Sequence, residues 1–202
     1  MFTGIITDVG KLHDMTGGHM RIRSRYDPAT IDIGASIAHD GCCLTVTDTE
    51  PVSGGGCIYG VDIGPETLAV TTLGAWQPGR RINLERALGL GAELGGHMMT
   101  GHVDGLGTLT SREMEGSSER FTIEMPPELA RYIAAKGSVA LNGTSLTVNE
   151  VTDSSFGICL IPHTLQVTNW GELKAGDKIN LEIDLLARYV ARLNDMEHLE
   201  RT

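Results

Sequence analysis

Apolar and polar residues alternate along short stretches of this chain, with the period of a β-strand. In 179–184 every second residue is isoleucine or leucine, and the same alternation runs through 82–85 and 44–47. Glycine and proline interrupt the chain at short intervals, and the Ser-Gly-Gly-Gly run at 53–56 has the composition of a hairpin tip. Many short strands at regular spacing predict a β-barrel or a β-sandwich.

Two segments have helical features instead. The segment 127–134 begins with proline, which suits the first turn of a helix, so we expect a short helix there. An apolar stripe at helical spacing predicts a longer helix near the C-terminus. The stripe consists of Leu185, Leu186, Tyr189, Val190 and Leu193. Either a barrel of the same chain or copies of the helix in an oligomer must cover it, and the residues leave both open.

The chain also repeats itself. Four sequence blocks of the first half recur in the same order about 100 residues later, the mark of a duplicated unit. The pairs are 4–12 with 101–109, 41–46 with 143–148, 65–68 with 162–165, and 79–85 with 176–182. Each copy, about 90 residues long, is large enough for one domain. A closed barrel has no exposed strand edge, which would explain how so short a unit holds together.

Composition and charge narrow the class of protein. The chain of 202 residues is 41% hydrophobic, which is ordinary for a globular protein and argues against disorder. A net charge of −10 leaves no basic surplus for phosphates, so nucleic acid is not an expected partner. No apolar stretch approaches a membrane span, and the first residues do not resemble a signal peptide. We therefore expect a cytoplasmic protein that does not enter a membrane.

Neither the cysteines nor the histidines are spaced like metal ligands. The cysteines are Cys42, Cys43, Cys57 and Cys159, without a C-x-x-C pair or the pattern of a disulfide framework. We expect Cys42 and Cys57 to be buried as small hydrophobic residues. Five of the seven histidines are scattered along the chain: His13, His19, His39, His97 and His198. We expect no metal site, and structural or surface roles for these histidines.

Several motifs together resemble a known family. They are Met-Phe-Thr-Gly-Ile-Ile at 1–6, Asn/Asp-Gly-x-x-Leu-Thr-Val at 40–46 and 142–148, Pro-x-Thr-Leu at 65–68 and 162–165, and Gly-Gly-His at 95–97 followed by Gly-His-Val-Asp at 101–104. Because the motifs occur in this order and several occur twice, the chain closely resembles riboflavin synthases. The resemblance extends from Met1 to about the terminal helix. The segment 167–171 is less typical than its counterpart 70–74.

The resemblance implies an all-β fold of two tandem six-stranded Greek-key barrels, with short helices and a C-terminal α-helix. The expected domains are an N-terminal barrel at 1–96, a C-terminal barrel at 97–184, and a trimerisation helix with its tail at 185–202. Each barrel would bind one molecule of 6,7-dimethyl-8-ribityllumazine. The protein would be a homotrimer, with the active site between the N-terminal barrel of one subunit and the C-terminal barrel of a neighbour. Association with lumazine synthase stays open.

The implied activity is a transfer of a four-carbon unit between two lumazines, which yields riboflavin and 5-amino-6-ribitylamino-uracil. One lumazine gives up a proton from its C7 methyl group, and a nucleophile attacks the other at C7. The substrate supplies its own acidic methyl group and electron sink, so no metal or flavin cofactor is implied. Proximity of the two substrates could contribute about 7–11 kcal/mol, and proton transfer about 10²–10⁴-fold.

The resemblance also implies two related binding pockets. The N-terminal pocket would comprise Gly4, Ile5, Ile6, Cys43, Leu44, Thr45, Asp62, Ile63, Gly64, Pro65, Glu66 and Thr67. The C-terminal pocket would comprise Gly101, His102, Val103, Lys136, Ser145, Leu146, Thr147, Cys159, Leu160, Ile161, Pro162, His163 and Thr164. Backbone amides on such strands suit the edge of a pyrimidine ring, and the hydroxyls of Thr67 and Thr164 suit ring or ribityl oxygens.

The two copies differ at positions where chemistry is expected. Cys43 corresponds to Ser145, and Ile5 corresponds to His102. Two equal binding sites would not need these differences, whereas a donor site and an acceptor site would. We therefore expect His102 and Ser145 to handle protons or position a nucleophile, with Asp184 nearby and Cys43 lining the partner pocket.

Each candidate has a structural alternative. His102 could be a hydrogen-bonded residue at the joint, Ser145 could satisfy backbone groups in a turn, and Asp184 could cap the terminal helix.

For the whole chain, the rival function is a fluorescent antenna protein that binds lumazine or flavin without turnover. Its second pocket would be degenerate, whereas this chain keeps Ser145, His102 and Lys136. A flavin-dependent reductase would need a nicotinamide site, and no G-x-G-x-x-G motif follows a strand.

Overall fold

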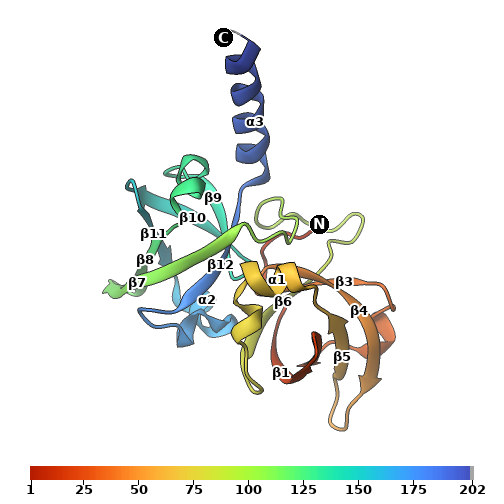
Figure 1. Ribbon diagram of the computed structural model, residues 1–202. Helices are drawn as coiled ribbons and strands as arrows, with labels where there is room; N and C mark the ends of the chain where they lie inside the picture. The colour runs from red at the N-terminus through yellow and green to blue at the C-terminus, as the bar shows by residue number, and fades with distance from the viewer. Residues whose placement is uncertain (201–202) are drawn as a thin grey trace.

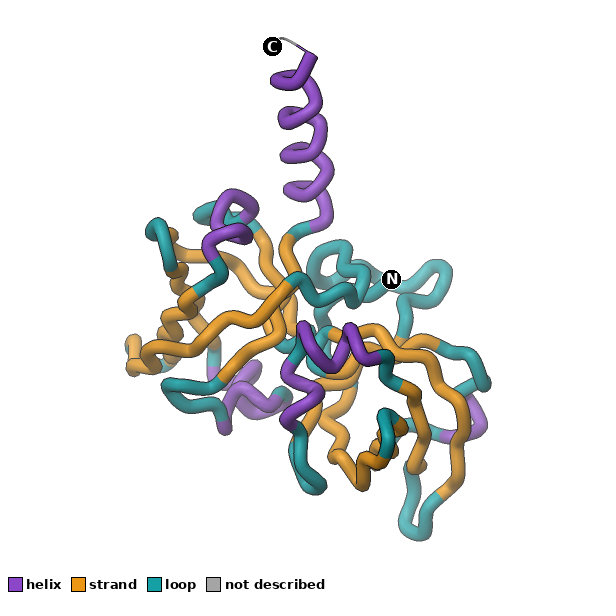
Figure 2. Tube along the Cα trace, in the orientation of Figure 1, coloured by secondary structure: helices purple, strands orange, loops and turns teal. Residues whose placement is uncertain are grey.

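The protein consists of two closed antiparallel barrels followed by a C-terminal helix (Figure 1). The computed structural model describes residues 1–200, with side chains described as far as Met196; residues 201–202 and the side chain of His198 lie outside the described part. In Figure 2 the strands gather in two groups, with loops and short helices around them. The predicted two-barrel fold is confirmed.

The first barrel carries the first sequence copy. Its strands are β1 (Asp8–Thr16), β2 (His19–Ser24), β3 (Ser36–His39), β4 (Cys42–Pro51), β5 (Cys57–Asp62) and β6 (Arg81–Arg86). They pair in the order β1-β2-β5-β4-β3-β6 before the barrel closes, and they are joined by η1 (Pro28–Thr30), α1 (Pro65–Val70) and η2 (Thr72–Ala75). The run 53–56 forms the turn between β4 and β5, and Cys42 and Cys57 are buried, as predicted.

The second barrel repeats this arrangement. Its strands are β7 (Gly105–Glu115), β8 (Ser118–Glu124), β9 (Ser138–Leu141), β10 (Thr144–Val151), β11 (Ser155–Leu160) and β12 (Lys178–Ile183). They follow the same cyclic order, with η3 (Pro127–Tyr132), α2 (Pro162–Val167) and η4 (Asn169–Glu172) between them. The helix expected at 127–134 is therefore a 3₁₀ helix. Each barrel encloses its own hydrophobic core.

A buried polar network joins the two barrels. On β6, Asn83 Nδ2 donates to the carbonyl oxygen of Asn142 and to Asn169 Oδ1, at 2.9 Å each. On β12, Asn180 Nδ2 donates to the carbonyl oxygen of Asp40 at 2.9 Å. Because buried polar groups are stable only when hydrogen-bonded, these bonds determine how one barrel sits on the other.

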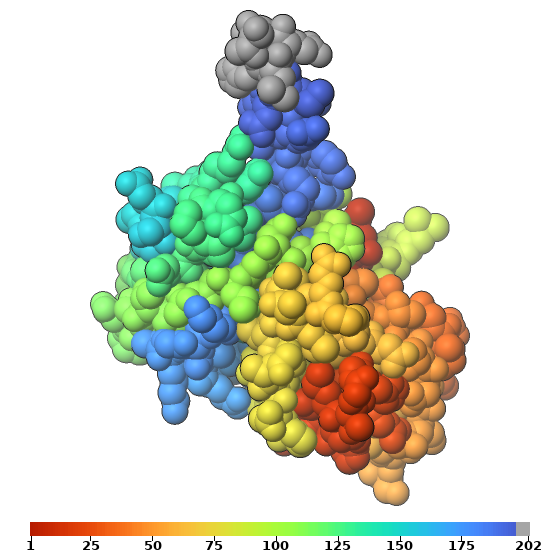
Figure 3. All heavy atoms as spheres, in the orientation of Figure 1, coloured from red at the N-terminus to blue at the C-terminus, as the bar shows by residue number. Residues whose placement is uncertain are grey.

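The C-terminal helix α3 (Leu185–Glu200) projects away from both barrels (Figure 3). Asp184 caps it, since Asp184 Oδ1 accepts the Leu186 N–H at 2.8 Å. Arg131 of η3 forms an ion pair with Asp195 of α3 at 2.8 Å. The apolar stripe stays largely exposed in the single chain, with Leu193 66% exposed. Among the described residues, no helix combines the length and the apolarity that crossing a membrane requires.

Candidate active site

The segment that precedes each barrel in the sequence packs against the other barrel. Gly4 precedes the first barrel, and its carbonyl oxygen accepts the Ser145 N–H of β10 at 2.9 Å. Gly101 precedes the second barrel, and its carbonyl oxygen accepts the Cys43 N–H of β4 at 2.8 Å. An antiparallel bridge between Phe2 and Met99 ties the two segments together. Each barrel is thus completed by a segment of the other copy.

Both crossing segments require glycine at the point of contact. Gly4 has φ 79° and Gly101 has φ 78°, a region that residues with a Cβ rarely adopt. A Cβ on Gly4 would lie 2.4 Å from Ser145 Cβ, and a Cβ on Gly101 would lie 2.6 Å from Cys43 Cβ. The two sequence blocks that carry these glycines are therefore needed for close approach of two backbones.

The crossed packing creates two composite pockets of about 260 Å³ each. The first, here called the Ser145 pocket, is lined among others by Gly4, Ile5, Ile6, Ser145, His163 and Thr164. The second, the Cys43 pocket, is lined among others by Cys43, Glu66, Thr67, Gly101, His102 and Val103. Each pocket combines one β-strand, one short helix and one crossing segment.

This grouping differs from the one expected from the sequence. By sequence, 4–6 belong with the first barrel and 101–103 with the second, because each segment belongs to that copy. In the structure 4–6 line the pocket of the second barrel, and 101–103 line the pocket of the first. The sequence contains no signal for the exchange, since the order of the blocks is the same in both arrangements.

Other predicted site residues lie around the pockets rather than in their linings. Gly64 and Pro65 begin α1, and Ile161 and Pro162 begin α2. Leu44, Ile63 and Leu160 are buried in the barrel cores, while Thr45 and Thr147 are exposed on β4 and β10 and Cys159 is half-buried on β11. Asp62 Oδ1 forms a hydrogen bond with His19 Nδ1 at 2.7 Å. Lys136 is exposed in a turn with φ 66°, outside both linings.

His97 is the functional candidate that sequence reasoning missed. Its Nδ1 forms a hydrogen bond with Ser145 Oγ at 2.7 Å, and its Nε2 is buried without a partner among the described residues. Burial lowers the pKa of His97, and the nearby Asp184 carboxylate raises it to a smaller extent. At neutral pH this ring is therefore uncharged and able to accept a proton.

The available signal for His97 was the glycine pair before it. A Cβ on Gly96 would lie 2.0 Å from the carbonyl oxygen of Thr3 and 2.7 Å from Ser145 Cβ. Only a residue without a side chain lets the chain turn His97 onto Ser145 at this distance. A Gly-Gly-His run between two repeats therefore carries more information than its place in a linker suggests.

The expected catalytic residues fall into two separate groups. Ser145 lies with His97, and Asp184 is close enough to influence the pKa of His97 while it caps α3. His102 is exposed and lines the Cys43 pocket with half-buried Cys43. The expected pairing of His102 with Ser145 in one pocket is thus replaced by His97 with Ser145 and His102 with Cys43.

Comparison with known proteins agrees with the duplicated architecture. Residues 3–87 and 100–184 each match the family model of the lumazine binding domain. The chain is 54% identical to a riboflavin synthase from Brucella abortus (strain 2308), over 96% of this chain and 98% of that protein. It is 36% identical to a riboflavin synthase from Bacillus subtilis (strain 168), over 95% of this chain and 89% of that protein.

Solved structures with the same fold include LumP complexed with riboflavin. That structure superposes with a TM-score of 0.75 at 25% identity, over 91% of this chain and 99% of LumP. LumP complexed with 6,7-dimethyl-8-(1'-D-ribityl) lumazine gives a TM-score of 0.75 at 24% identity, over 90% of this chain and 98% of LumP. Because it has two lumazine-binding domains and is 54% identical to a riboflavin synthase over nearly its full length, the chain belongs to the riboflavin synthase family.

Proposed function

We propose that this chain catalyses the riboflavin synthase reaction, in which two molecules of 6,7-dimethyl-8-ribityllumazine give riboflavin and 5-amino-6-ribitylamino-uracil. The observation that carries the proposal is the presence of two composite pockets of equal volume, about 260 Å³, with different reactive side chains. Two similar pockets suit a reaction that consumes two identical substrates. Different side chains suit substrates with different roles.

The reaction balances without an external oxidant or reductant. One lumazine loses a proton from its C7 methyl group, and a nucleophile adds to C7 of the other. The two molecules then join, the nucleophile leaves C7, and the adduct fragments, so that four carbons move from one molecule to the other and all atoms of the two lumazines appear in the two products. The pteridine ring accepts the electrons, which leaves orientation and proton transfer to the protein.

Ser145 and His97 are the proton-transfer pair in this proposal. The imidazole is neutral because burial lowers its pKa, and its Nδ1 lies 2.7 Å from Ser145 Oγ. A proton can therefore pass between the pocket and the imidazole through the serine hydroxyl. Cys43 and His102 contact the second lumazine, and the residues that line the two pockets form the substrate-binding site.

The proposal includes a homotrimer held together by α3. The stripe on this helix is exposed along its length, with Leu186 63%, Tyr189 60% and Val190 58% exposed. A helix that leaves such a face uncovered in the single chain needs a partner, and copies of itself provide one. The Cys43 pocket of one subunit would then face the Ser145 pocket of a neighbour.

The double variant Leu186→Glu, Val190→Glu tests this assembly. Charges on the stripe should produce monomers with little activity, measured by analytical ultracentrifugation and lumazine turnover. Asn194→Glu adds charge to an exposed position of α3 outside the stripe and should leave the trimer intact. Fully active monomers would contradict a site shared between subunits.

We also propose that the protein works in the cytoplasm. All four of its cysteines are free thiols, which suits a reducing compartment. Fractionation of cells followed by immunodetection should find the protein with cytoplasmic markers.

The function is tested with the purified protein and 6,7-dimethyl-8-ribityllumazine alone, without metal, nucleotide or oxygen. Riboflavin and the amino-uracil should form in equal amounts, each at half the rate of lumazine loss. Tight fluorescent binding without turnover would instead indicate an antenna protein, and Ser145 and His97 would then have structural roles.

A further inference from the structure

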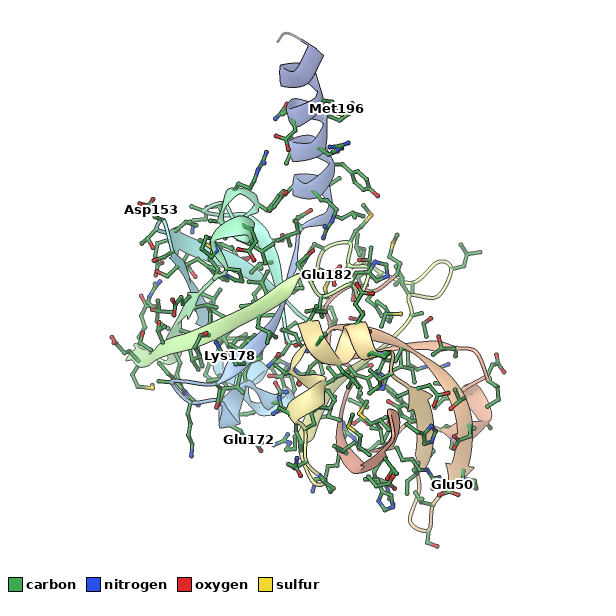
Figure 4. The ribbon with its side chains drawn as sticks, viewed as in Figure 1. Glu50, Asp153, Glu172, Lys178, Glu182 and Met196 are labelled. Atoms are coloured by element: carbon green, nitrogen blue, oxygen red, sulfur yellow. The ribbon has the colours of Figure 1, made fainter. Side chains whose placement is uncertain are left out.

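Two buried carboxylates lie where the crossing segments meet the barrels. Glu85 on β6 and Glu182 on β12 occupy equivalent positions in the two copies, and each is only 4% exposed. Figure 4 shows Glu182 near the end of β12, at the junction of the barrels. Neither residue lines the Ser145 pocket or the Cys43 pocket, and neither belongs to the pairs of reactive side chains described above.

Each carboxylate holds one crossing segment with three hydrogen bonds. Glu85 Oε1 accepts the N–H and the hydroxyl of Thr3 at 2.7 Å each, and its Oε2 accepts the Gly4 N–H at 2.8 Å. Glu182 Oε1 accepts the N–H of Thr100 at 2.7 Å and its hydroxyl at 2.8 Å, and its Oε2 accepts the Gly101 N–H at 3.0 Å. The two sets of bonds are equivalent atom by atom.

Burial of an ionisable group requires an explanation beyond packing. Burial raises the pKa of both carboxyl groups, so desolvation opposes the charged form, while the three donors favour it. A carboxylate has only acceptors, which matches a segment that presents only N–H and O–H donors. A glutamine in the same place would turn its amide N–H groups toward one of those donors.

The segment held by Glu85 in turn holds the Ser145–His97 pair. The carbonyl oxygen of Thr3 accepts the His97 N–H at 3.2 Å, and that of Gly4 accepts the Ser145 N–H at 2.9 Å. The segment held by Glu182 ends at Gly101, whose carbonyl oxygen accepts the Cys43 N–H at 2.8 Å. A segment of two residues therefore connects each carboxylate to the reactive residues in the pocket of the opposite barrel.

We propose that Glu85 and Glu182 are crossed positioning residues: Glu85 of the first barrel positions Ser145 and His97, and Glu182 of the second barrel positions Cys43. The role in turnover rests on the proposed function, because it takes the two pockets to be the lumazine sites. The positioning itself is a property of the unliganded chain and can be measured without substrate.

The test compares Glu85→Gln and Glu182→Gln by hydrogen exchange in the ligand-free trimer. Glu85→Gln should speed exchange at least about tenfold at Thr3, Gly4 and Ser145, since a lost charge-assisted hydrogen bond has effects of about 10–100-fold. Glu182→Gln should speed exchange at Thr100, Gly101 and Cys43 instead. Glu113→Gln, at an exposed position of β7, is the control and should change neither set.

Lumazine turnover is then measured with the same variants. Each Gln variant should lower kcat about 10–100-fold, and Glu113→Gln should not. If a Gln variant does not fold, Glu85→Asp or Glu182→Asp keeps the charge with a shorter reach and should give the same crossed pattern. An equal rise in exchange at both segments, or crossed exchange with unchanged turnover, would overturn the positioning role. If each Gln variant speeds exchange at its own segment but the wild type has no turnover, the proposed function alone would be refuted.

Discussion

The two barrels have the same frame but different interiors. Both follow one cyclic strand order, and both hold a crossing segment through a buried glutamate. Inside the first barrel, however, His39 Nε2 lies 2.9 Å from Tyr59 Oη, and both side chains are fully buried. The equivalent positions of the second barrel are Leu141 and Phe156. After duplication, the contacts that assemble the molecule were retained while core and pocket residues diverged.

The two pockets likewise have equivalent architecture but different side chains. Cys43 corresponds to Ser145, and Glu66 corresponds to His163, although the surrounding strands and helices are equivalent. His97 belongs to the segment after the first barrel, whereas the second barrel continues into α3. Among the described residues the histidine–serine pair therefore occurs in the Ser145 pocket alone, and the asymmetry arises because the chain continues differently after each barrel.

The largest expected effect is loss of the Ser145–His97 pair. Ser145→Ala and His97→Gln should each lower kcat about 10²–10⁴-fold, because each removes one member of the proton-transfer pair. Cys43→Ser should lower kcat less, since no histidine in the described part of the chain forms a hydrogen bond with Cys43. Steady-state lumazine turnover measures all three, with Ser154→Ala in an exposed turn as the control. Equal losses in the two pockets would mean that the barrels are chemically equivalent.

A smaller effect is expected at the crossing glycines. Gly4→Ala and Gly101→Ala should each lower turnover about tenfold or more, because the added Cβ would lie only 2.4 Å from Ser145 Cβ or 2.6 Å from Cys43 Cβ and would push the segment away. The control is Gly17→Ala, which has φ 60° but open space around it. It carries the backbone strain, about 1–2 kcal/mol, without the contact, and should lower only the melting temperature. Equal turnover in all three variants would show that crossing is not needed for activity.

The smallest effect on activity is expected inside the first barrel. Burial lowers the pKa of His39 to about 4, so the unfolded chain binds the proton more readily, and stability is lost as pH falls below the unfolded value. Between pH 7 and pH 5 this group alone should remove roughly 2 kcal/mol from the free energy of unfolding.

The double variant His39→Leu, Tyr59→Phe gives the first barrel the residues of the second and should abolish this contribution. Denaturant unfolding at several pH values measures it as a difference from the wild type. The opposite contribution of Asp40, whose pKa burial raises to about 6, is common to both proteins and cancels. An unchanged pH dependence would show that His39 is not the group responsible, and turnover at pH 7 should be unaffected.

The strands were predictable because their signal is local. Alternation at 82–85 and 179–184 corresponds to β6 and β12, and the internal repeat required two similar domains. The same alternation gave no indication that Asn83, Glu85 and Glu182 are buried, since a polar residue on a strand usually faces water. Asn83 is buried because it contacts the other barrel, whereas Glu85 and Glu182 are each covered by the segment that precedes their own barrel.

By itself, the sequence determined the duplication, the strands, the terminal helix with its apolar stripe, and Ser145 and Cys43 as the differing members of equivalent pockets. These depend on residue type and short spacing, which a linear chain records directly. Only the tertiary structure decided that the segments before the barrels cross over, that His97 rather than His102 bonds Ser145, and that Glu85 and Glu182 hold the crossing segments. The physical reason is that each of these contacts joins residues about 50–140 positions apart, and its partner is chosen by hydrogen bonding and steric fit at the barrel junction.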